Sequence, residues 1–286
     1  MTVRILQRGF NFSQDGPGNR LVYHLQGCNM RCPWCSNPES MEPNGSILAD
    51  GGMADSLCPF GAVHGGMPDA ARCRTCDRSC LNAHSKHLRR SCTEETVQAV
   101  LCEIDRCAAM FFDGGGVTFT GGEATMQFDA LDALLTALHK KGIHTALETN
   151  GSHPRLPELF DRIDWLILDC KHWDDEIHRR VIGCSNQQTL QNLRAAAAQR
   201  SQLLVRIPLI GHFNDSVRDA AAFAQLLSVL RGSEHHVETL RYHEYGKDKW
   251  KQCGMTYTVR DAFVSDDTYR AFCKILSDSG LHLVHT

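Results

Sequence analysis

The sequence has no run of about 18 apolar residues, so nothing in it predicts a membrane-spanning helix. The first residues, Met1 to Arg8, lack the apolar core of a secretory signal peptide, and we therefore expect a cytoplasmic protein. The chain also has no large excess of one sign of charge, since the formal net charge of its 286 residues is only −3. This balance argues against a general nucleic-acid-binding surface.

Cysteine, by contrast, is abundant, with 14 in the chain. Disulfides are typical of secreted proteins, so this number in a cytoplasmic chain points to metal or cluster ligands. The strongest pattern is Cys28-x3-Cys32-x2-Cys35. A closed zinc site needs four ligands, and zinc sites with three protein ligands usually use histidine and carboxylate. The spacing therefore favours a 4Fe–4S cluster with three thiolates, which leaves one iron open to a small molecule.

Predicted strands and helices alternate from residue 93 onward. Thr93 is expected to cap a helix, and further helices are expected around Leu131 to Leu138, at 188–199 and at 217–231. The predicted strands cover residues 21–25, 117–120, 144–148, 165–169, 203–208 and 237–242. Such alternation predicts an α/β fold with a parallel sheet, either open or closed into a barrel.

Residues 44–92 differ in composition from the rest of the chain, with glycines and cysteines in place of periodic apolar runs. We expect one core domain over residues 1–286, with residues 44–92 as a small insertion inside it. The insertion has too few apolar residues to form a hydrophobic core by itself, so we expect a metal to organise it. Four cysteines are its candidate ligands: Cys58, followed by proline, and then Cys73, Cys76 and Cys80. This ferredoxin-like spacing suits one additional 4Fe–4S cluster, with Cys92 as a spare ligand. A structural zinc ion is the alternative.

Polar residues stand at the predicted strand ends, where parallel α/β folds bind their ligands. They are Thr120-Gly121-Gly122-Glu123, Glu148-Thr149-Asn150, Asp169-Cys170-Lys171, Arg206 and His243. Each has an ordinary explanation: a strand-to-helix turn, a helix cap, a salt bridge or a satisfied core histidine. The two carboxylates Glu148 and Asp169 could bind a cation or pair with Lys171. Arg206 is expected to pair with one of these acids or with an anionic ligand group.

Several segments together resemble one family. The cysteine spacing with Trp34 is similar to the signature of the radical S-adenosylmethionine (radical SAM) superfamily. Its glycyl-radical-enzyme activases, the relatives of pyruvate formate-lyase activating enzyme, share the remaining motifs. These are Asp15-Gly16-Pro17-Gly18-Asn19-Arg20, Asn37-Pro38-Glu39-Ser40, Thr120 to Glu123, Asp169-Cys170-Lys171, Arg206 to Ile210 and Tyr242 to Trp250. They run in the family's order along nearly the whole chain.

The resemblance implies a partial (β/α)6 barrel with the cysteine-rich insertion, and a role for each site residue. Cys28, Cys32 and Cys35 would hold the cluster that binds S-adenosylmethionine. Other residues would contact that cofactor: Gly121, Gly122 and Glu123 its amino group, and Arg206 and His243 its carboxylate and ribose. Asp169 would also bind it, and Lys171, near the cofactor, would be the catalytic residue. Glu148, Thr149 and Asp169 match a monovalent-cation site. The departures Ala124, Cys170 and Arg241 remove no ligand.

The implied activity is reductive cleavage of S-adenosylmethionine to a 5′-deoxyadenosyl radical. This radical would abstract hydrogen from a backbone glycine of a large partner enzyme, after an electron arrives from a flavodoxin or ferredoxin-type donor. One alternative is a radical SAM enzyme acting on a small molecule, which would have an enclosed substrate pocket. Another is an iron–sulfur electron carrier or a zinc-stabilised binding module. That alternative leaves four residues unexplained: Glu123, Asp169, Arg206 and His243.

Overall fold

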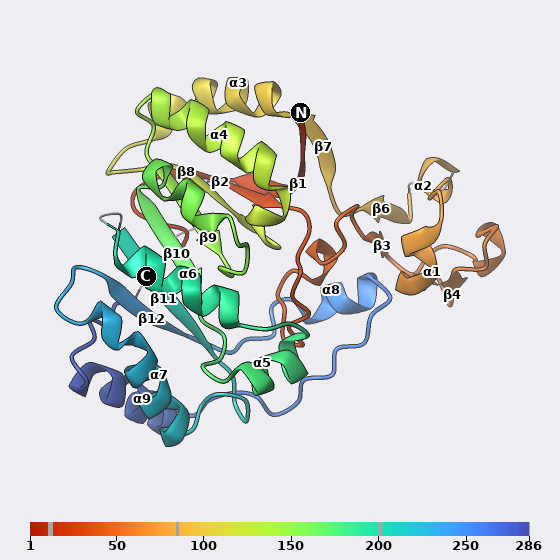
Figure 1. The fold of residues 1–286 in the computed structure, drawn as a ribbon. Coiled ribbons are helices and arrows are strands. Elements are labelled where there is room, and N and C mark those ends of the chain that lie inside the picture. The colour runs from red at the N-terminus through yellow and green to blue at the C-terminus, as the bar shows by residue number, and fades with distance from the viewer. Residues whose placement is uncertain (11–13, 84–85, 200–201, 286) are drawn as a thin grey trace.

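The computed structural model describes residues 1–10, 14–83, 86–199 and 202–285. Its centre is an eight-stranded sheet with the order β12-β11-β10-β9-β8-β2-β1-β7 (Figure 1). The strands are β1 (Thr2–Gly9), β2 (Arg20–Leu25), β7 (Thr93–Thr96), β8 (Gly116–Gly121), β9 (Thr145–Thr149), β10 (Trp165–Asp169), β11 (Gln202–Leu209) and β12 (His236–Arg241). The predicted strands from residue 117 onward are confirmed to within one or two residues at each end.

Most of the sheet is parallel. Neighbouring strands pair in parallel from β2 through β8, β9, β10 and β11 to β12. Only β1 pairs antiparallel, with β2 on one side and β7 on the other. The carboxyl ends of the parallel strands therefore meet at one edge of the sheet, and the predicted α/β fold is confirmed.

Helices connect the strands and cover the sheet (Figure 1). They are α3 (Val97–Cys107), α4 (Phe128–Lys140), α5 (Asp175–Ile182), α6 (Gln187–Ala197), α7 (Val217–Leu226), α8 (Lys247–Gln252) and α9 (Asp266–Asp278). Short 3-10 turns are η1 (Pro38–Ser40), η2 (Asp55–Leu57), η3 (Ala108–Met110), η4 (Ala124–Gln127), η5 (Leu156–Arg162) and η6 (Leu227–Leu230). Leu131, Leu134, Leu135 and Leu138 lie at helical spacing on α4, and all four are buried in the main core as predicted.

The predicted helix start at Thr93 is wrong. Residues 93–96 form strand β7, in which Thr96 pairs with Thr2 and Thr93 pairs with Ile5. The helix begins four residues later, and the Thr96 hydroxyl caps it by accepting a hydrogen bond from the Ala99 amide at 3.1 Å. The edge of β1 needs a hydrogen-bonding partner, and pairing with it overrides the local capping signal.

Residues 44–92 contain short elements: β3 (Ile47–Ala49), β4 (Val63–His64), β5 (Met67–Pro68), α1 (Ala70–Thr75), α2 (Cys80–Ala83) and β6 (Leu88–Arg90). β3 pairs antiparallel with β6, and β4 with β5. A small apolar cluster around Ile47, Val63 and Leu88 includes Cys73, with Cys58 and Cys80 packed against it. In Figure 1 this segment projects to the side of the sheet, and α8, which contacts β3 and η1, lies between.

Candidate active site

One cavity of about 270 Å³ opens at the carboxyl ends of the parallel strands. It brings together most of the polar residues predicted at strand ends. Its lining includes Cys28, Cys32, Cys35, Gly121, Gly122, Glu123, Glu148, Thr149, Asp169, Lys171 and His243. Because parallel strands end at the same edge, residues from segments more than 200 positions apart in the sequence share this wall.

The cysteine loop follows β2 and is tied down from several directions. The Arg31 amide donates to the carbonyl of Ile182 at 2.9 Å, at the end of α5. From α8, the Trp250 indole donates to the carbonyl of Cys35 at 2.9 Å. Lys249, also on α8, forms an ion pair with the buried Glu39 at 2.8 Å. The loop is therefore fixed by elements on both sides before any ligand binds.

The three thiols of this loop suit a cluster better than a single ion. Burial raises the pKa of Cys28, Cys32 and Cys35, and the thiol of Cys32 further raises the pKa of both neighbours. They are therefore protonated until a metal displaces the protons. All three cysteines line one cavity, and three thiolates match the protein ligands of a 4Fe–4S cluster that has one open iron.

The Gly121-Gly122 pair packs against β2 and the start of the cysteine loop. Gly121 has φ +125°, and a Cβ atom there would lie 2.3 Å from the Leu25 amide nitrogen. A Cβ atom on Gly122 would lie 2.5 Å from the carbonyl oxygen of Gly27. Only glycine fits at these positions, because the backbone itself forms the cavity wall beside the cysteines.

Glu123 is buried, and its carboxylate is satisfied by the protein. One oxygen accepts from the Thr125 amide at 3.0 Å, the Thr125 hydroxyl at 2.5 Å and the Thr149 hydroxyl at 2.7 Å. The other accepts from the Asn150 amide at 2.6 Å. Burial raises the pKa of Glu123, and these hydrogen bonds oppose the rise. The carboxylate thus ties the end of β9 to the Gly-Gly turn.

Replacing Glu123 with Gln is expected to lower the free energy of unfolding by about 1–3 kcal/mol, since an NH2 group would face donors that now bond to oxygen. The Michaelis constant for S-adenosylmethionine should rise, because the turn loses its tie to β9. Urea unfolding and cleavage kinetics measure both effects. Glu158→Gln, an exposed glutamate hydrogen-bonded to Arg155, is the matched control. Equal unfolding midpoints for the two variants would contradict the assignment.

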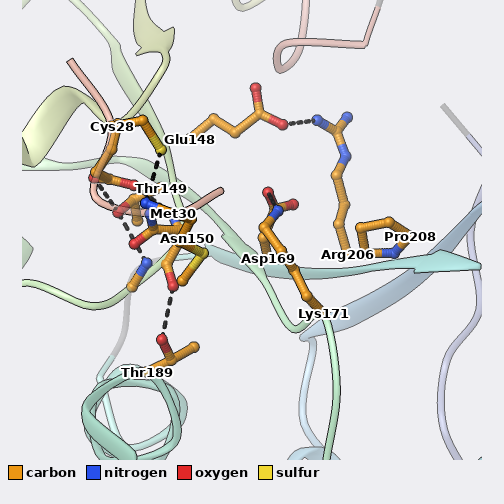
Figure 2. Close-up of polar contacts among 12 residues, drawn as sticks. Cys28, Met30, Glu148, Thr149, Asn150, Asp169, Lys171, Thr189, Arg206 and Pro208 are labelled. Carbon is orange, nitrogen blue, oxygen red and sulfur yellow. Dashed lines mark hydrogen bonds and ion pairs between the residues drawn. The ribbon is translucent and has the colours of Figure 1, made fainter. Parts of the chain in front are cut away.

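Both strand-end acids already have cationic partners. Lys171 donates to Asp169 at 2.7 Å, and Arg206 donates to Glu148 at 2.7 Å (Figure 2). Burial opposes the charge on Glu148, but Arg206 and the Thr120 hydroxyl hold the pKa of Glu148 below its usual value. Burial likewise opposes the charge on Lys171, and Asp169 and Cys32 raise the pKa of Lys171 above its usual value. The carboxylates are therefore balanced by side chains of the protein itself.

Arg206 lies beneath the cavity rather than in its lining. It also donates to Glu238 at 2.8 Å, and Glu238 is its register partner on β12. Sequence reasoning missed Glu238, although a carboxylate inside the predicted strand 237–242 was a usable signal. The register between β11 and β12, which pairs the two residues, could not be read from the sequence.

His243 and Thr149 both line the cavity, as predicted. The ring of His243 stacks on Tyr245 at 4.2 Å, and burial lowers the pKa of His243. The hydroxyl of Thr149, a candidate cation ligand with Glu148 and Asp169, donates to Glu123. Asn150, which sequence reasoning named without a role, donates from its side chain to Asn29 at 2.9 Å and so joins β9 to the cysteine loop.

Asp15 is a further buried carboxyl near this network, for which the sequence gave a motif but no role. Burial and the charge of Glu148 raise the pKa of Asp15 to about 7, although Arg206 and Arg20 act in the opposite direction. The unfolded chain releases this proton near pH 4. Folding therefore takes up a proton between about pH 4 and pH 7, and this group lowers stability as the pH rises through that window.

The side chain introduced by Asp15→Asn cannot ionise, so this variant should not lose stability in this way as the pH rises. Between pH 5 and pH 8, the free energy of unfolding of the variant is expected to rise relative to the wild type by about 2 kcal/mol. Urea unfolding of the metal-free protein at both pH values measures it, with the exposed Asp129→Asn as the control. Parallel pH profiles for wild type and Asp15→Asn would show that Asp15 ionises normally.

A second cavity lies in the 44–92 segment and is lined by all four of its predicted ligands, Cys58, Cys73, Cys76 and Cys80. Apolar residues such as Ile47, Val63 and Leu88 complete the wall. Cys92 is absent from this lining and is buried elsewhere, where a Cβ atom on Gly45 would lie 2.9 Å from its sulfur. The tertiary structure thus places the four predicted ligands around one cavity and leaves Cys92 outside its lining.

The comparisons with known proteins show the family of the chain. The Radical SAM superfamily model matches residues 22–224. The chain is 34% identical to the isethionate sulfite-lyase activating enzyme of Nitratidesulfovibrio vulgaris, over 82% of each chain. It is 32% identical to the indoleacetate decarboxylase activating enzyme of Tractidigestivibacter scatoligenes, over 86% of this chain and 85% of that one.

A solved structure shares the fold. The radical SAM methyltransferase from Sphaerobacter thermophilus aligns with a TM-score of 0.55 and 16% identity, over 96% of this chain and 67% of that one. None of the helices in the described ranges is long and apolar enough to span a membrane. Membership of the superfamily implies a 4Fe–4S cluster and S-adenosylmethionine, and the three-thiol cavity fits them. The chain is thus a radical SAM enzyme and belongs to the glycyl-radical enzyme activating enzymes.

Proposed function

We propose that this enzyme generates a glycyl radical in a partner enzyme by removing a hydrogen atom from the Cα of a backbone glycine. The observation that carries the proposal is the grouping of Cys28, Cys32 and Cys35 with Gly121, Gly122 and Lys171 around one cavity that opens to the surface. Bound there, the cluster and S-adenosylmethionine supply the 5′-deoxyadenosyl radical. An open cavity suits a loop of another protein better than a small substrate, which an enzyme normally encloses.

The residues of this chain act by holding and orienting the cofactors. Cys28, Cys32 and Cys35 hold the cluster, and the backbone of Gly121 and Gly122 receives the amino group of S-adenosylmethionine. Asp169, Lys171 and His243 line the same cavity and orient the carboxylate and ribose of S-adenosylmethionine. Glu123 acts indirectly, because its carboxylate ties the Gly121-Gly122 turn to the end of β9.

Arg206, which lies beneath the cavity lining, supports this lining together with the candidate cation ligands. Arg206 holds Glu148 in place and acts on the cofactor through it. Glu148, Thr149 and Asp169 form the candidate monovalent-cation site, in which an ion would compete with Arg206 and Lys171 for the two carboxylates.

The direct test is anaerobic incubation of the reduced, reconstituted enzyme and S-adenosylmethionine with candidate glycyl radical enzymes. An electron paramagnetic resonance doublet from a glycyl radical in one of them is expected. The related activating enzymes named above suggest a decarboxylase or a carbon–sulfur lyase as first candidates. Cleavage of S-adenosylmethionine without a doublet in any candidate, but with turnover of a small molecule, would favour the small-molecule alternative.

Residues 44–92 form an inserted unit that holds one additional 4Fe–4S cluster on Cys58, Cys73, Cys76 and Cys80. Four thiols around one apolar cavity support this assignment. Apolar surroundings and thiolate ligands are typical of such clusters.

Cys76→Ala is expected to lower the iron content of the reconstituted protein from about eight to about four per chain, because it removes one ligand of the insertion cluster only. The three ligands of the other cluster stay intact, so binding of S-adenosylmethionine should persist. Iron and zinc analysis measures the change, with Cys102→Ala on the exposed face of α3 as the control. About one zinc and about four irons in the wild type would establish the zinc alternative.

A further inference from the structure

A basic hollow of about 320 Å³ lies on the surface of the insertion. We call it the arginine hollow, and it is lined by Arg74, Arg78 and Arg90 together with Asn44 and Cys76. Asp77 contributes a single negative charge to the lining. Neither the sequence motifs nor the cavity at the strand ends accounts for this cluster of cations.

The arginine hollow adjoins the four-cysteine cavity. Cys76 and Arg78 line both, so a single layer of residues separates the hollow from the thiols. Cys76 is itself only partly buried. A molecule that binds in the hollow therefore comes within one side chain of whatever the four cysteines hold.

Much of the positive charge in the hollow is not neutralised. Arg74 pairs with Glu42 at 2.7 Å. Arg78 donates to the carbonyl of Asn44 at 2.7 Å, and Arg90 donates to the same carbonyl at 3.0 and 2.7 Å. In the ranges that the structure describes, no carboxylate lies within 4.0 Å of either guanidinium. These cations are held in place by a neutral acceptor and remain available to an anionic partner.

We propose that the arginine hollow is the docking surface for an acidic one-electron carrier protein that reduces the insertion. This rests on the additional cluster proposed above. The carrier loses one electron and the cluster on the four cysteines gains it, and no bond forms or breaks. Charge complementarity favours fast, weak and salt-sensitive association, which suits a carrier that must leave after each transfer.

The position of the hollow agrees with a carrier rather than with the protein substrate. A glycine loop must enter the cavity at the strand ends. Figure 1 shows the insertion to the side of that sheet, beyond α8. A carrier at the insertion and a substrate at the cavity use different parts of the surface.

The test measures binding of an oxidised flavodoxin of strongly negative net charge to the reconstituted enzyme by titration calorimetry. Arg74→Gln/Arg90→Gln should weaken binding about three- to thirtyfold at about 50 mM salt, and raising the salt to about 300 mM should weaken the wild type similarly. Arg74→Lys/Arg90→Lys keeps both charges and should bind within about twofold of the wild type. Arg194→Gln/Arg270→Gln, on exposed positions of α6 and α9, is the control of equal net charge.

Stopped-flow reduction by the flavodoxin should slow in the Gln variant, whereas reduction by dithionite should not. An unchanged iron content shows that the insertion of the variant is folded. Equal flavodoxin affinities for the Gln variant and the control would overturn the proposal. So would normal flavodoxin binding with a loss of partner activation under dithionite, because the hollow would then bind the protein substrate. Arginine-dependent binding to an insertion that holds zinc would also overturn the proposal, because zinc accepts no electron from a carrier.

Discussion

Cys32→Ala is expected to abolish reductive cleavage of S-adenosylmethionine. Cys32 is the middle thiol of the loop and is buried against Met30 and Ile182, so no water-exposed group can take its place as a ligand. With two thiolates left, the cluster loses its anchor, and about four irons per chain should be lost. Release of 5′-deoxyadenosine by the reduced protein and iron analysis measure the two effects.

The matched control is Cys102→Ala, which removes an exposed thiol from α3. It should retain the iron content and the cleavage activity of the wild type. The Cys32 variant should also keep its far-ultraviolet circular dichroism, since the sheet does not depend on this loop. Release of 5′-deoxyadenosine at the control rate would exclude Cys32 from the cluster and overturn the site.

Arg206→Met is expected to lower the free energy of unfolding by about 3–5 kcal/mol, the largest stability effect that the structure predicts. Arg206 lies 2.7 Å from Glu148 and 2.8 Å from Glu238, and it also donates to the backbone carbonyl of Gln14. Its removal leaves the buried carboxylate of Glu238 and the partly buried carboxylate of Glu148 without their cation. Urea unfolding of the metal-free protein measures the loss.

A double-mutant cycle separates the charge from the packing. Arg206→Met/Glu238→Leu removes one of the two uncompensated carboxylates and should recover about 1–2 kcal/mol relative to Arg206→Met alone. Arg206→Lys keeps the charge but not the fork of donors, and its stability should fall between those of the wild type and Arg206→Met. Strictly additive effects of the Arg206 and Glu238 substitutions would show that the ion pair is not what stabilises this wall.

The spacing of polar residues at predicted strand ends gave most of the site. Gly121, Glu148, Asp169 and His243 are far apart in the sequence and lie around one cavity. This could be predicted because parallel strands joined by helices must all end at the same edge of the sheet. The family resemblance then named the cofactor, and the comparisons confirm the family.

Pairwise contacts across the sheet could not be predicted. The ion pair of Arg206 with Glu238 depends on the register of β11 against β12, and the strand at 93–96 depends on the exposed edge of β1. Glu123 was expected to contact the cofactor and lines the cavity; that its carboxylate also accepts four hydrogen bonds from the protein could not be read from the sequence. Such contacts join segments that local sequence patterns treat separately.

By itself, the sequence determined the chemistry: three thiols at a fixed spacing with one open position, the glycine turn beside them, and a second set of four cysteines. Ligand spacing and backbone sterics are local properties, so they can be read along the chain. Only the tertiary structure decided which charges neutralise one another. It buried Arg206 between two acids and left the cations of the arginine hollow facing solvent beside Cys76. Burial and partner distance fix the energy of a charge, and both exist only in the folded protein.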